Sequence, residues 1–409
     1  MQRPLLLSTL LLITATASAQ ETVTISTNAQ NADQVYYSLA NGIMATRPLA
    51  EWDLAFEITG FTSSILVNTA KGNKVYHVGP AGDWDATTAA TPEAWTALAN
   101  SETSWNAGAL THGADGGFNL GWGTYDMDTH IVTGTELFAI ELAGGTWKKL
   151  RIDGLVTGTY HFTYADIDGS DEQTGTLVKT AFQDKVFGYW DLSAHAAVDR
   201  EPAAAQWGLL FTKYLSDLGG TMYPVAGVLH NKGVQVAQLD GVDPVSVYHA
   251  QAEGQYSSDI NTIGSDWKTF NGSAYVYADD RVYYVKGVDG ALWKLIFTGY
   301  GGGATGTMTF TQELVSAVSV NDIARSNGQV MVHPNPTMDG RAQLVLDVPA
   351  EQAMLTVHDL AGRAVFAEQL TGIGTLTVRT IDLAHAGAGA YVVRVEHERG
   401  VATTRLIVQ

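Results

Sequence analysis

The sequence contains no cysteine in its 409 residues. This absence excludes disulfides, thiolate zinc sites, iron–sulfur clusters, covalently attached haem, cysteine nucleophiles and a lipidated N-terminal cysteine. Proline is also scarce, with 10 residues against 43 glycines, and the glycines lack collagen-like spacing. Stability must therefore come from packing of an apolar interior.

Charge is scarce and one-sided. Charged residues make up 16% of the chain, below the roughly 25% of an average globular protein, and 23 basic against 42 acidic residues give a net charge of −19. A nucleic acid or an anionic membrane would have to bind against this field. Both are excluded as primary partners.

Hydrophobic residues are plentiful enough for several cores. They make up 45% of the chain, and aromatic residues 10%, a composition that disordered chains do not have. At roughly 150 residues per domain, the length predicts two or three folded units.

Residues 1–19 are typical of a secretory signal peptide. Arg3 precedes the apolar run 5–13, and Ala17-Ser18-Ala19 supplies small residues for a signal peptidase. The run is shorter than the roughly 20 residues that span a bilayer, although an N-terminal membrane anchor is the alternative. No later stretch is long and apolar enough to span a membrane, which predicts an exported product without a transmembrane helix.

Residues 331–409 differ in sequence pattern from the rest of the chain. Short segments of alternating apolar residues, separated by Gly, Asp and Pro, predict a small antiparallel β-sandwich. The ordered motifs are Pro334-Asn335-Pro336, Asp359-Leu360-Ala361-Gly362-Arg363, Ile381-Asp382-Leu383, Gly389-Ala390-Tyr391-Val392-Val393-Arg394-Val395 and Arg405-Leu406-Ile407-Val408. This segment resembles the C-terminal sorting domain of the type IX secretion system of Bacteroidetes. The resemblance implies that the secretion machinery binds residues 331–409; an immunoglobulin-like spacer is the alternative.

The middle of the chain repeats itself. Trp52-Asp53-Leu54-Ala55-Phe56 corresponds to Trp207-Gly208-Leu209-Leu210-Phe211, and Trp122 corresponds to Trp267. A period this long indicates a duplicated domain rather than a solenoid. The expected limits are 20–175 for the first copy and 176–316 for the second, followed by a linker over 317–330.

Each copy is expected to be mostly strand. Glycine turns predict hairpins over 138–150 and 283–297. Thr91 and Pro92 predict the start of one short helix through Leu98. The repeated tryptophans are interpreted as core anchors, with sugar-stacking platforms as the alternative.

The two copies also resemble the HmuY family of exported haem-binding proteins. The matching segments are Tyr36-Tyr37-Ser38-Leu39 with Asn41-Gly42, 52–56, 281–290, 294–300 and 306–310. The resemblance implies two tandem HmuY-like all-β domains before the sorting domain and, in the founding members, haem held by two axial side chains. The chain departs from the family in lacking a lipoprotein cysteine. It also reads Phe270-Asn271-Gly272 where the family can carry a histidine ligand.

Non-covalent haem needs an apolar slot and axial donors such as His or Met. Trp122, Tyr125, Met127 and His130 lie within nine residues of one another and are the candidate haem-binding group. The alternative is that these histidines are merely hydrogen-bonded or exposed. Further donors are His77, His112, His230 and His249, with Met222 and Tyr223 near His230.

A second candidate site is the acidic run at Asp166, Asp168 and Asp171. Carboxylate oxygens are the ligands that calcium prefers, but the run lacks full EF-hand spacing, and a solvated acidic linker is the alternative. Enzyme motifs for nucleophilic, zinc-dependent, phosphate-binding or dinucleotide chemistry are absent. We therefore expect a non-enzymatic, secreted or surface-displayed ligand-binding protein, with haem capture as the leading activity. A surface adhesion or glycan-binding module is the rival.

Overall fold

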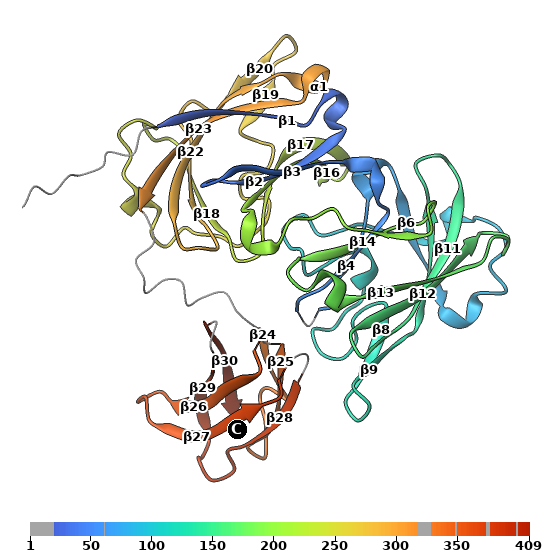
Figure 1. Cartoon of the computed structure of the whole chain (residues 1–409), viewed down its shortest axis with the longest axis vertical. Coiled ribbons are helices and arrows are strands. Elements are labelled where there is room, and N and C mark those ends of the chain that lie inside the picture. Colours follow the sequence, from blue (N-terminus) through green and yellow to red (C-terminus); the bar gives the residue numbers. More distant parts are fainter. Residues whose placement is uncertain (1–19, 61, 317–328, 348–349, 374–376, 398–399) are drawn as a thin grey trace, which may run out of the picture.

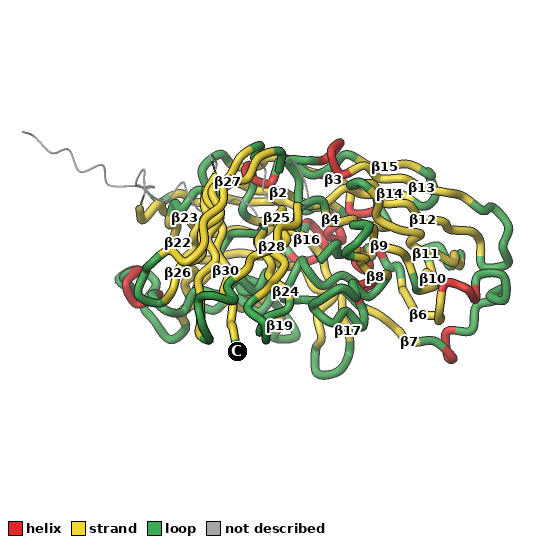
Figure 2. Tube along the Cα trace, turned by 90° about the horizontal axis from the view of Figure 1, so that it is seen from below, coloured by secondary structure: helices red, strands yellow, loops and turns green. Residues whose placement is uncertain are grey.

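The computed structural model describes residues 20–60, 62–316, 329–347, 350–373, 377–397 and 400–409. The expected signal peptide and most of the expected linker lie outside these ranges. Figure 2 shows strands and loops throughout, with only short helical turns. The predicted all-β fold is confirmed. Within the described ranges, no helix is both long and apolar enough to cross a bilayer.

Two antiparallel sheets pack together as sandwich I. The larger sheet has the order β13-β12-β11-β10-β6-β7, with β8 and β9 joined to β11, and the smaller has the order β15-β14-β4-β5. Their bounds are β4 Leu54–Glu57, β5 Ile65–Val67, β6 Lys74–Pro80, β7 Thr96–Leu98, β8 Gly123–Asp126, β9 Ile131–Gly134, β10 Glu136–Glu141, β11 Trp147–Val156, β12 Thr159–Asp166, β13 Gln173–Val178, β14 Phe187–Asp191 and β15 Ala196–Val198. Inward-facing Phe56, Phe138 and Phe162 help to fill the core between the sheets.

Sandwich II has the same plan. One sheet has the order β1-β23-β22-β21-β18 and the other β17-β16-β2-β3, beside a separate hairpin of β19 and β20. The bounds are β1 Glu21–Ser26, β2 Asp33–Ser38, β3 Gly42–Pro48, β16 Leu209–Asp217, β17 Met222–His230, β18 Gln235–Leu239, β19 Lys268–Phe270, β20 Tyr275–Tyr277, β21 Val282–Lys286, β22 Leu292–Tyr300 and β23 Thr307–Ser316. Its core contains a cluster of Tyr37, Phe211 and Phe310 with ring centroids 5.5–5.8 Å apart.

Among the described residues, helical turns lie in the connections between these strands. They are η1 Ala29–Asn31, η2 Leu49–Glu51, η3 Thr69–Lys71, η4 Ala81–Asp83, η5 Pro92–Ala94, η6 Ala109–Thr111, η7 Lys179–Phe182, η8 Ala204–Gln206, η9 His249–Ala252 and α1 Gly302–Thr305. The predicted helix at Thr91 is wrong beyond its first turn, because residues 96–98 form β7 and pair with β6. Trp95 packs against Tyr76 and Trp147 there, so tertiary contacts override the local helix signal.

The C-terminal segment forms the predicted small β-sandwich. Its sheets have the orders β24-β25-β28 and β27-β26-β29-β30. The bounds are β24 Gln329–His333, β25 Arg341–Asp347, β26 Gln352–Asp359, β27 Ala364–Thr371, β28 Thr377–Asp382, β29 Gly389–His397 and β30 Gly400–Val408. Asn335 of the Pro-Asn-Pro motif fastens the terminal strand: its amide donates to the Arg405 carbonyl at 2.7 Å and accepts from the Ile407 N–H at 2.9 Å.

The two repeats exchange strands. Tyr37 of β2 pairs with Leu209 of β16, and its repeat equivalent Trp190 of β14 pairs with Leu54 of β4. Likewise β1 adds to the edge of β23, while β13 adds to β12 (Figure 1). Strands β1–β3 of the first repeat therefore complete sandwich II, and their equivalents β13–β15 of the second repeat complete sandwich I.

This exchange changes the domain organisation expected from the sequence. The expected boundary between residues 175 and 176 falls inside β13, and the sheets cross it. Sandwich I is one continuous stretch from β4 to β15, whereas sandwich II combines β1–β3 with β16–β23. The two predicted hairpins do form, with Phe138 opposite Leu150 and Tyr283 opposite Leu295. In their turns, Gly145 and Gly290 have φ angles of 85° and 80°.

Candidate functional site

Trp122, one of the four predicted haem-site residues, is a core residue. Its side chain is fully buried in sandwich I, and its Nε1–H donates to the Ser63 carbonyl at 2.9 Å. Trp52, Trp207 and Trp267 are also buried. The interpretation of these repeated tryptophans as core anchors is confirmed.

The other three predicted residues lie on the hairpin of β8 and β9. The Asp126 carboxylate organises its turn, accepting hydrogen bonds from the Asp128 N–H and from the N–H and hydroxyl of Thr129. These bonds hold the pKa of Asp126 below its usual range. His130 ends the turn with a φ of 58°, a left-handed conformation that costs a non-glycine residue of order 1 kcal/mol or more. The side chain of Met127 is half-buried in the same turn.

Tyr125 orients the imidazole of His130. The Tyr125 hydroxyl lies 2.8 Å from His130 Nδ1, and Phe118 stacks on the Tyr125 ring with centroids 5.8 Å apart. The imidazole is exposed. With its proton on Nδ1 the ring donates to Tyr125, which leaves the Nε2 lone pair facing solvent, the arrangement of a ligating histidine. Tyr125, Met127 and His130 thus share one hairpin, while Trp122 points into the core.

A second Tyr–His pair was not predicted from the sequence. His195, in the turn between β14 and β15, has a φ of 54°, and its Nδ1 lies 2.9 Å from the hydroxyl of Tyr164. Asp191 organises this turn by accepting from the backbone N–H groups of Ser193 and Ala194. An aspartate four residues before a histidine is common to both turns and could have signalled the second pair.

The equivalent hairpin of the second repeat lacks this donor arrangement. Asn271 of the β19–β20 turn accepts from the N–H groups of Ser273 and Ala274, as Asp126 does in the first repeat. Phe270 stands where the first repeat has Tyr125 and has no hydroxyl to orient an imidazole. At 270–272, where the family can carry a histidine ligand, this chain therefore has a turn that the Asn271 side chain stabilises.

Three of the other candidate histidines contact protein groups or are buried, whereas His112, Met222 and Tyr223 are exposed. His77 Nε2 lies 2.7 Å from the Glu136 carboxylate. His230 is buried, and burial lowers the pKa of its imidazole. His249 packs against the exposed ring of Tyr248, with centroids 4.1 Å apart. None of these rings shares the β8–β9 hairpin with His130.

The acidic run forms the turn between β12 and β13. Asp166 and Asp171 both contact the Lys148 ammonium, at 2.8 and 2.9 Å, and Asp168 accepts from the Ser170 N–H and hydroxyl. Lys148 thus occupies the position between carboxylates that a cation would take. Within the described part of the chain, no three acidic or histidine side chains are grouped to hold a metal ion. Calcium binding here stays a prediction.

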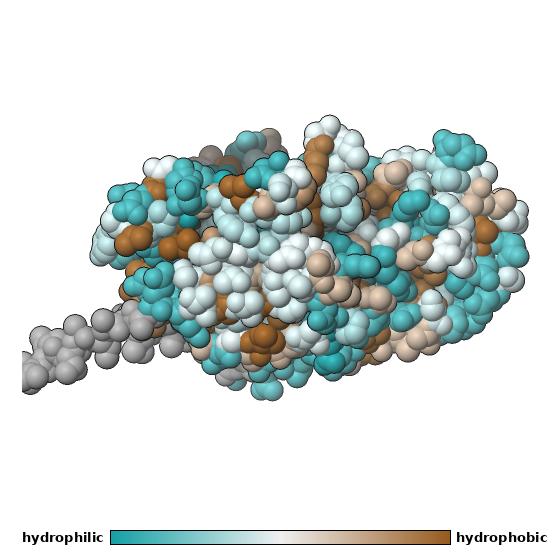
Figure 3. Space-filling model, turned by 90° about the horizontal axis from the view of Figure 1, so that it is seen from above, coloured by the Kyte–Doolittle hydropathy of each residue, from teal (hydrophilic) through white to brown (hydrophobic). Residues whose placement is uncertain are grey.

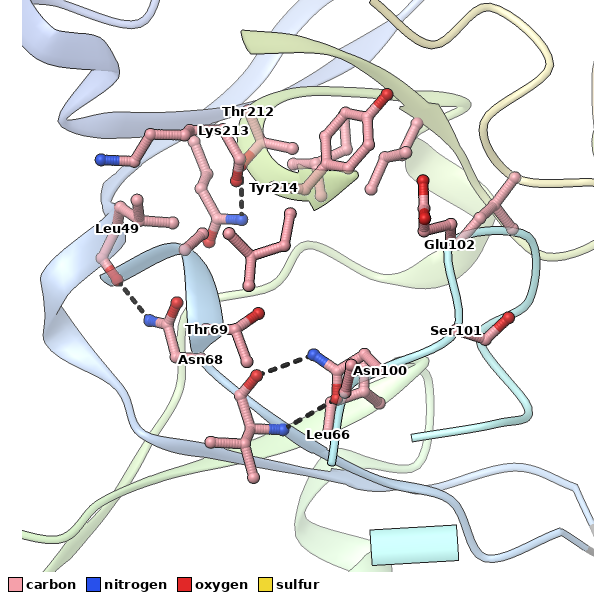
Figure 4. A pocket seen from close by; sticks show the side chains of 18 of the residues that line it. Leu49, Leu66, Asn68, Thr69, Asn100, Ser101, Glu102, Thr212, Lys213 and Tyr214 are labelled. Atoms are coloured by element: carbon pink, nitrogen blue, oxygen red, sulfur yellow. Dashed lines mark hydrogen bonds between the residues drawn. The ribbon is translucent and has the colours of Figure 1, made fainter. Parts of the chain in front are cut away.

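A cavity lies between the two sandwiches (Figure 4). Its volume is about 80 Å³, well below the roughly 300–1,000 Å³ of pockets that enclose drug-sized ligands. Asn68 donates to the Leu49 carbonyl, and Asn100 bonds both backbone groups of Val67. These polar side chains bond to the backbone and so stabilise the fold. A porphyrin is too large to fit inside the cavity.

The molecular surface offers no broad apolar groove on the face shown in Figure 3. Hydrophobic residues there form small patches surrounded by polar ones. Isolated apolar side chains of this kind are normal on soluble proteins.

Solved structures show only weak similarity to this chain. PorZ, a surface component of the type IX secretion system of Porphyromonas gingivalis, is 11% identical over 70% of this chain and 44% of its own, with a TM-score of 0.15. An FMN-binding beta-glucuronidase from Facaelibacterium prausnitzii L2-6 is 10% identical over 49% of this chain and 32% of its own, with a TM-score of 0.16. The BSP domain of a biofilm-associated protein is 12% identical over 97% of this chain and 67% of its own, with a TM-score of 0.15. The chain thus spans less than half the length of the first two, and no curated protein matches it.

Two family models match the chain. The model of the secretion system C-terminal sorting domain matches residues 331–409. This segment directs the protein to the type IX machinery and to the medium or the outer cell surface. The model of the HmuY protein matches residues 30–311 as one unit, spanning both repeats and both sandwiches. The chain belongs to the HmuY family.

Proposed function

We propose that this protein is a non-enzymatic ligand-binding protein that captures haem outside the cell, with His130 as an axial donor. The observation that carries the proposal is the 2.8 Å contact between His130 Nδ1 and the Tyr125 hydroxyl on an exposed hairpin. Membership of the HmuY family supports haem as the ligand, as the resemblance implies.

The hydrogen bond between the His130 imidazole and Tyr125, together with the ring of Phe118, favours a ligand over a merely exposed histidine. A ligating histidine usually donates its other ring nitrogen to a fixed acceptor, which sets the tautomer and the ring orientation. Tyr125 is itself fixed by Phe118, with the two rings inclined by 25°. The half-buried rings of Phe118 and Tyr125 also offer apolar surface close to the donor.

A binding role fits the inter-sandwich cavity better than catalysis does. The Glu102 carboxylate at its edge accepts from the Ser216 hydroxyl at 2.6 Å and from the Asp217 N–H at 2.8 Å. Gln34 donates to the Thr212 hydroxyl at 2.9 Å. Groups already committed to the scaffold are poorly placed to act as general acids or bases.

Titration of the full chain with haemin, followed by absorbance in both redox states, tests this proposal. We expect a saturable Soret shift that His130→Ala abolishes. Tyr125→Phe removes the orienting hydrogen bond and should weaken binding about tenfold, as loss of such partners does at other metal sites.

His195→Ala is the matched control, because His195 is also exposed, also has a positive φ and is also bonded to a tyrosine, whereas the stacked rings of Phe118 and Tyr125 lie only beside His130. It should leave the titration unchanged. A flat titration in both redox states, or identical curves for the wild type and His130→Ala, would contradict haem capture at this hairpin. Glycan-array binding without a Soret change would favour the adhesion alternative.

A further inference from the structure

The strand exchange creates a pseudo-symmetric junction between the two sandwiches. Tyr36 packs edge-on against Trp207 with centroids 5.1 Å apart, and their repeat equivalents Tyr189 and Trp52 do the same at 5.2 Å. The hydroxyls of Tyr36 and Tyr189 meet at 3.3 Å. These four rings belong to one buried cluster that joins both halves of the chain.

Two differences in sequence between the repeats break this symmetry. Trp52 donates its Nε1–H to Gln34 at 3.3 Å, but the residue equivalent to Gln34 in the second repeat is Phe187. The Nε1–H of Trp207 accordingly has no acceptor among the described residues, although Trp207 is only 3% exposed. The second difference is one of size, because Ala55 stands opposite Tyr189 where its equivalent Leu210 stands opposite Tyr36.

A cavity lies beside these positions. An inner chamber of about 40 Å³ is lined by Ala55, Phe187 and Trp207, among others. It shares Gln34, Trp52, Leu66, Trp105 and Leu210 with the outer cavity of about 80 Å³. A buried N–H without a partner is destabilising, so a hydrogen-bond acceptor of a ligand in the inner chamber would be stabilised.

We propose that the two chambers bind one small, neutral, planar aromatic molecule whose hydrogen-bond acceptor takes the Nε1–H of Trp207. The site is distinct from the His130 hairpin, and haem is too large for it. Together the chambers approach the roughly 150 Å³ of a buried cavity that binds benzene.

The walls decide the class of ligand. Trp52, Trp105 and Phe187 favour an aromatic ring, which packs against such faces and edges. A net charge on the ligand is disfavoured because most residues that line the inner chamber are apolar or aromatic, and a charge placed among them would lose its hydration. A neutral aromatic molecule with a carbonyl oxygen fits these walls, and its oxygen can accept a hydrogen bond from the Nε1–H of Trp207.

Calorimetric titration of the full chain with benzamide tests the proposal, with toluene as the probe that lacks an acceptor. We expect saturable binding of benzamide at one site per chain. Trp207→Phe should weaken the affinity for benzamide about threefold to tenfold, which corresponds to one net hydrogen bond. The affinity for toluene, which cannot accept this hydrogen bond, should be the same in the variant and the wild type. Ala55→Leu, which restores the residue of the second repeat, should fill the inner chamber and abolish benzamide binding.

Trp267→Phe is the matched control. Its indole is another buried donor without a described acceptor, but it lies in the core of sandwich II and lines neither chamber. Benzamide should bind this variant as it binds the wild type. Absence of saturable benzamide binding, or unchanged binding by Ala55→Leu of native thermal stability, would overturn the proposal, whatever the outcome with haemin.

Discussion

Replacement of Arg200 by alanine is expected to lower the free energy of unfolding by about 3–5 kcal/mol, as loss of one member of a buried charged network does. The Arg200 side chain is 1% exposed. Its guanidinium donates to Gln34 Oε1 at 2.6 Å, to the Pro48 carbonyl at 3.0 Å and to Glu51 at 2.9 Å. The variant loses these bonds and leaves a void where the two sandwiches meet.

Arg47→Ala is the internal control for this change, because Arg47 is the equivalent of Arg200 in the first repeat. Arg47 is exposed and makes one bond of 3.3 Å, to the Arg200 carbonyl. Its loss should cost less than about 1 kcal/mol. Urea unfolding followed by tryptophan fluorescence measures both variants. Equal, small losses would show that the buried network contributes little to joining the sandwiches.

Glu201→Gln is expected to remove a pH dependence of stability between about pH 4.5 and 7. Burial raises the pKa of Glu201 from 4.5 to about 7, although its carboxylate accepts from the Val186 N–H and the Tyr189 hydroxyl, both at 2.8 Å. The folded state therefore binds this proton more tightly than the unfolded state does. The associated stability is full below pH 4.5 and is lost as the pH rises through 7, by roughly 3 kcal/mol at 1.36 kcal/mol per pKa unit.

Urea unfolding at pH 5 and at pH 8 measures this effect. The wild type should be less stable at pH 8 than at pH 5 by roughly the above amount, beyond any change shared with Glu201→Gln. Glu253→Gln is a suitable control, because Glu253 is 61% exposed and only loosely paired with Lys286, at 3.6 Å. If Glu201→Gln keeps the wild-type pH profile, the carboxyl of Glu201 does not titrate in this range.

The sequence predicted the strands well and their partners poorly. Alternating apolar residues and glycine turns located the hairpins at 138–150 and 283–297, because those signals are local. The duplication was visible in the tryptophan spacing. The exchange was not, because Tyr37 could face Leu54 of its own repeat or Leu209 of the other with the same pattern. Only the three-dimensional packing distinguishes these pairings.

The candidate site was predicted in part. Tyr125 and His130 lie five residues apart, and a hairpin turn brings them into contact. Trp122 was wrongly grouped with them as a ligand-facing residue, since spacing does not reveal which side of a strand faces the core. The pair of Tyr164 and His195 was missed because 31 residues separate its members.

No sequence pattern predicted which residues meet at the junction between the sandwiches. Arg200 and Gln34 are 166 residues apart, and neither is part of a motif. Their contact depends on the exchange that brings β2 and β14 to the same interface. A buried network of this kind follows from topology, which the local signals did not determine.

The central claim is that the body of the molecule is one scaffold of two repeats that complete each other. Separate expression of residues 20–170 and 171–316, divided in the turn before β13, followed by circular dichroism, urea unfolding and sedimentation, tests it most directly. We predict that neither fragment forms a folded monomer, because each lacks the three strands that the other supplies, and that mixing the two restores a cooperative unfolding transition. A monomeric 20–170 fragment that unfolds cooperatively on its own would contradict this claim.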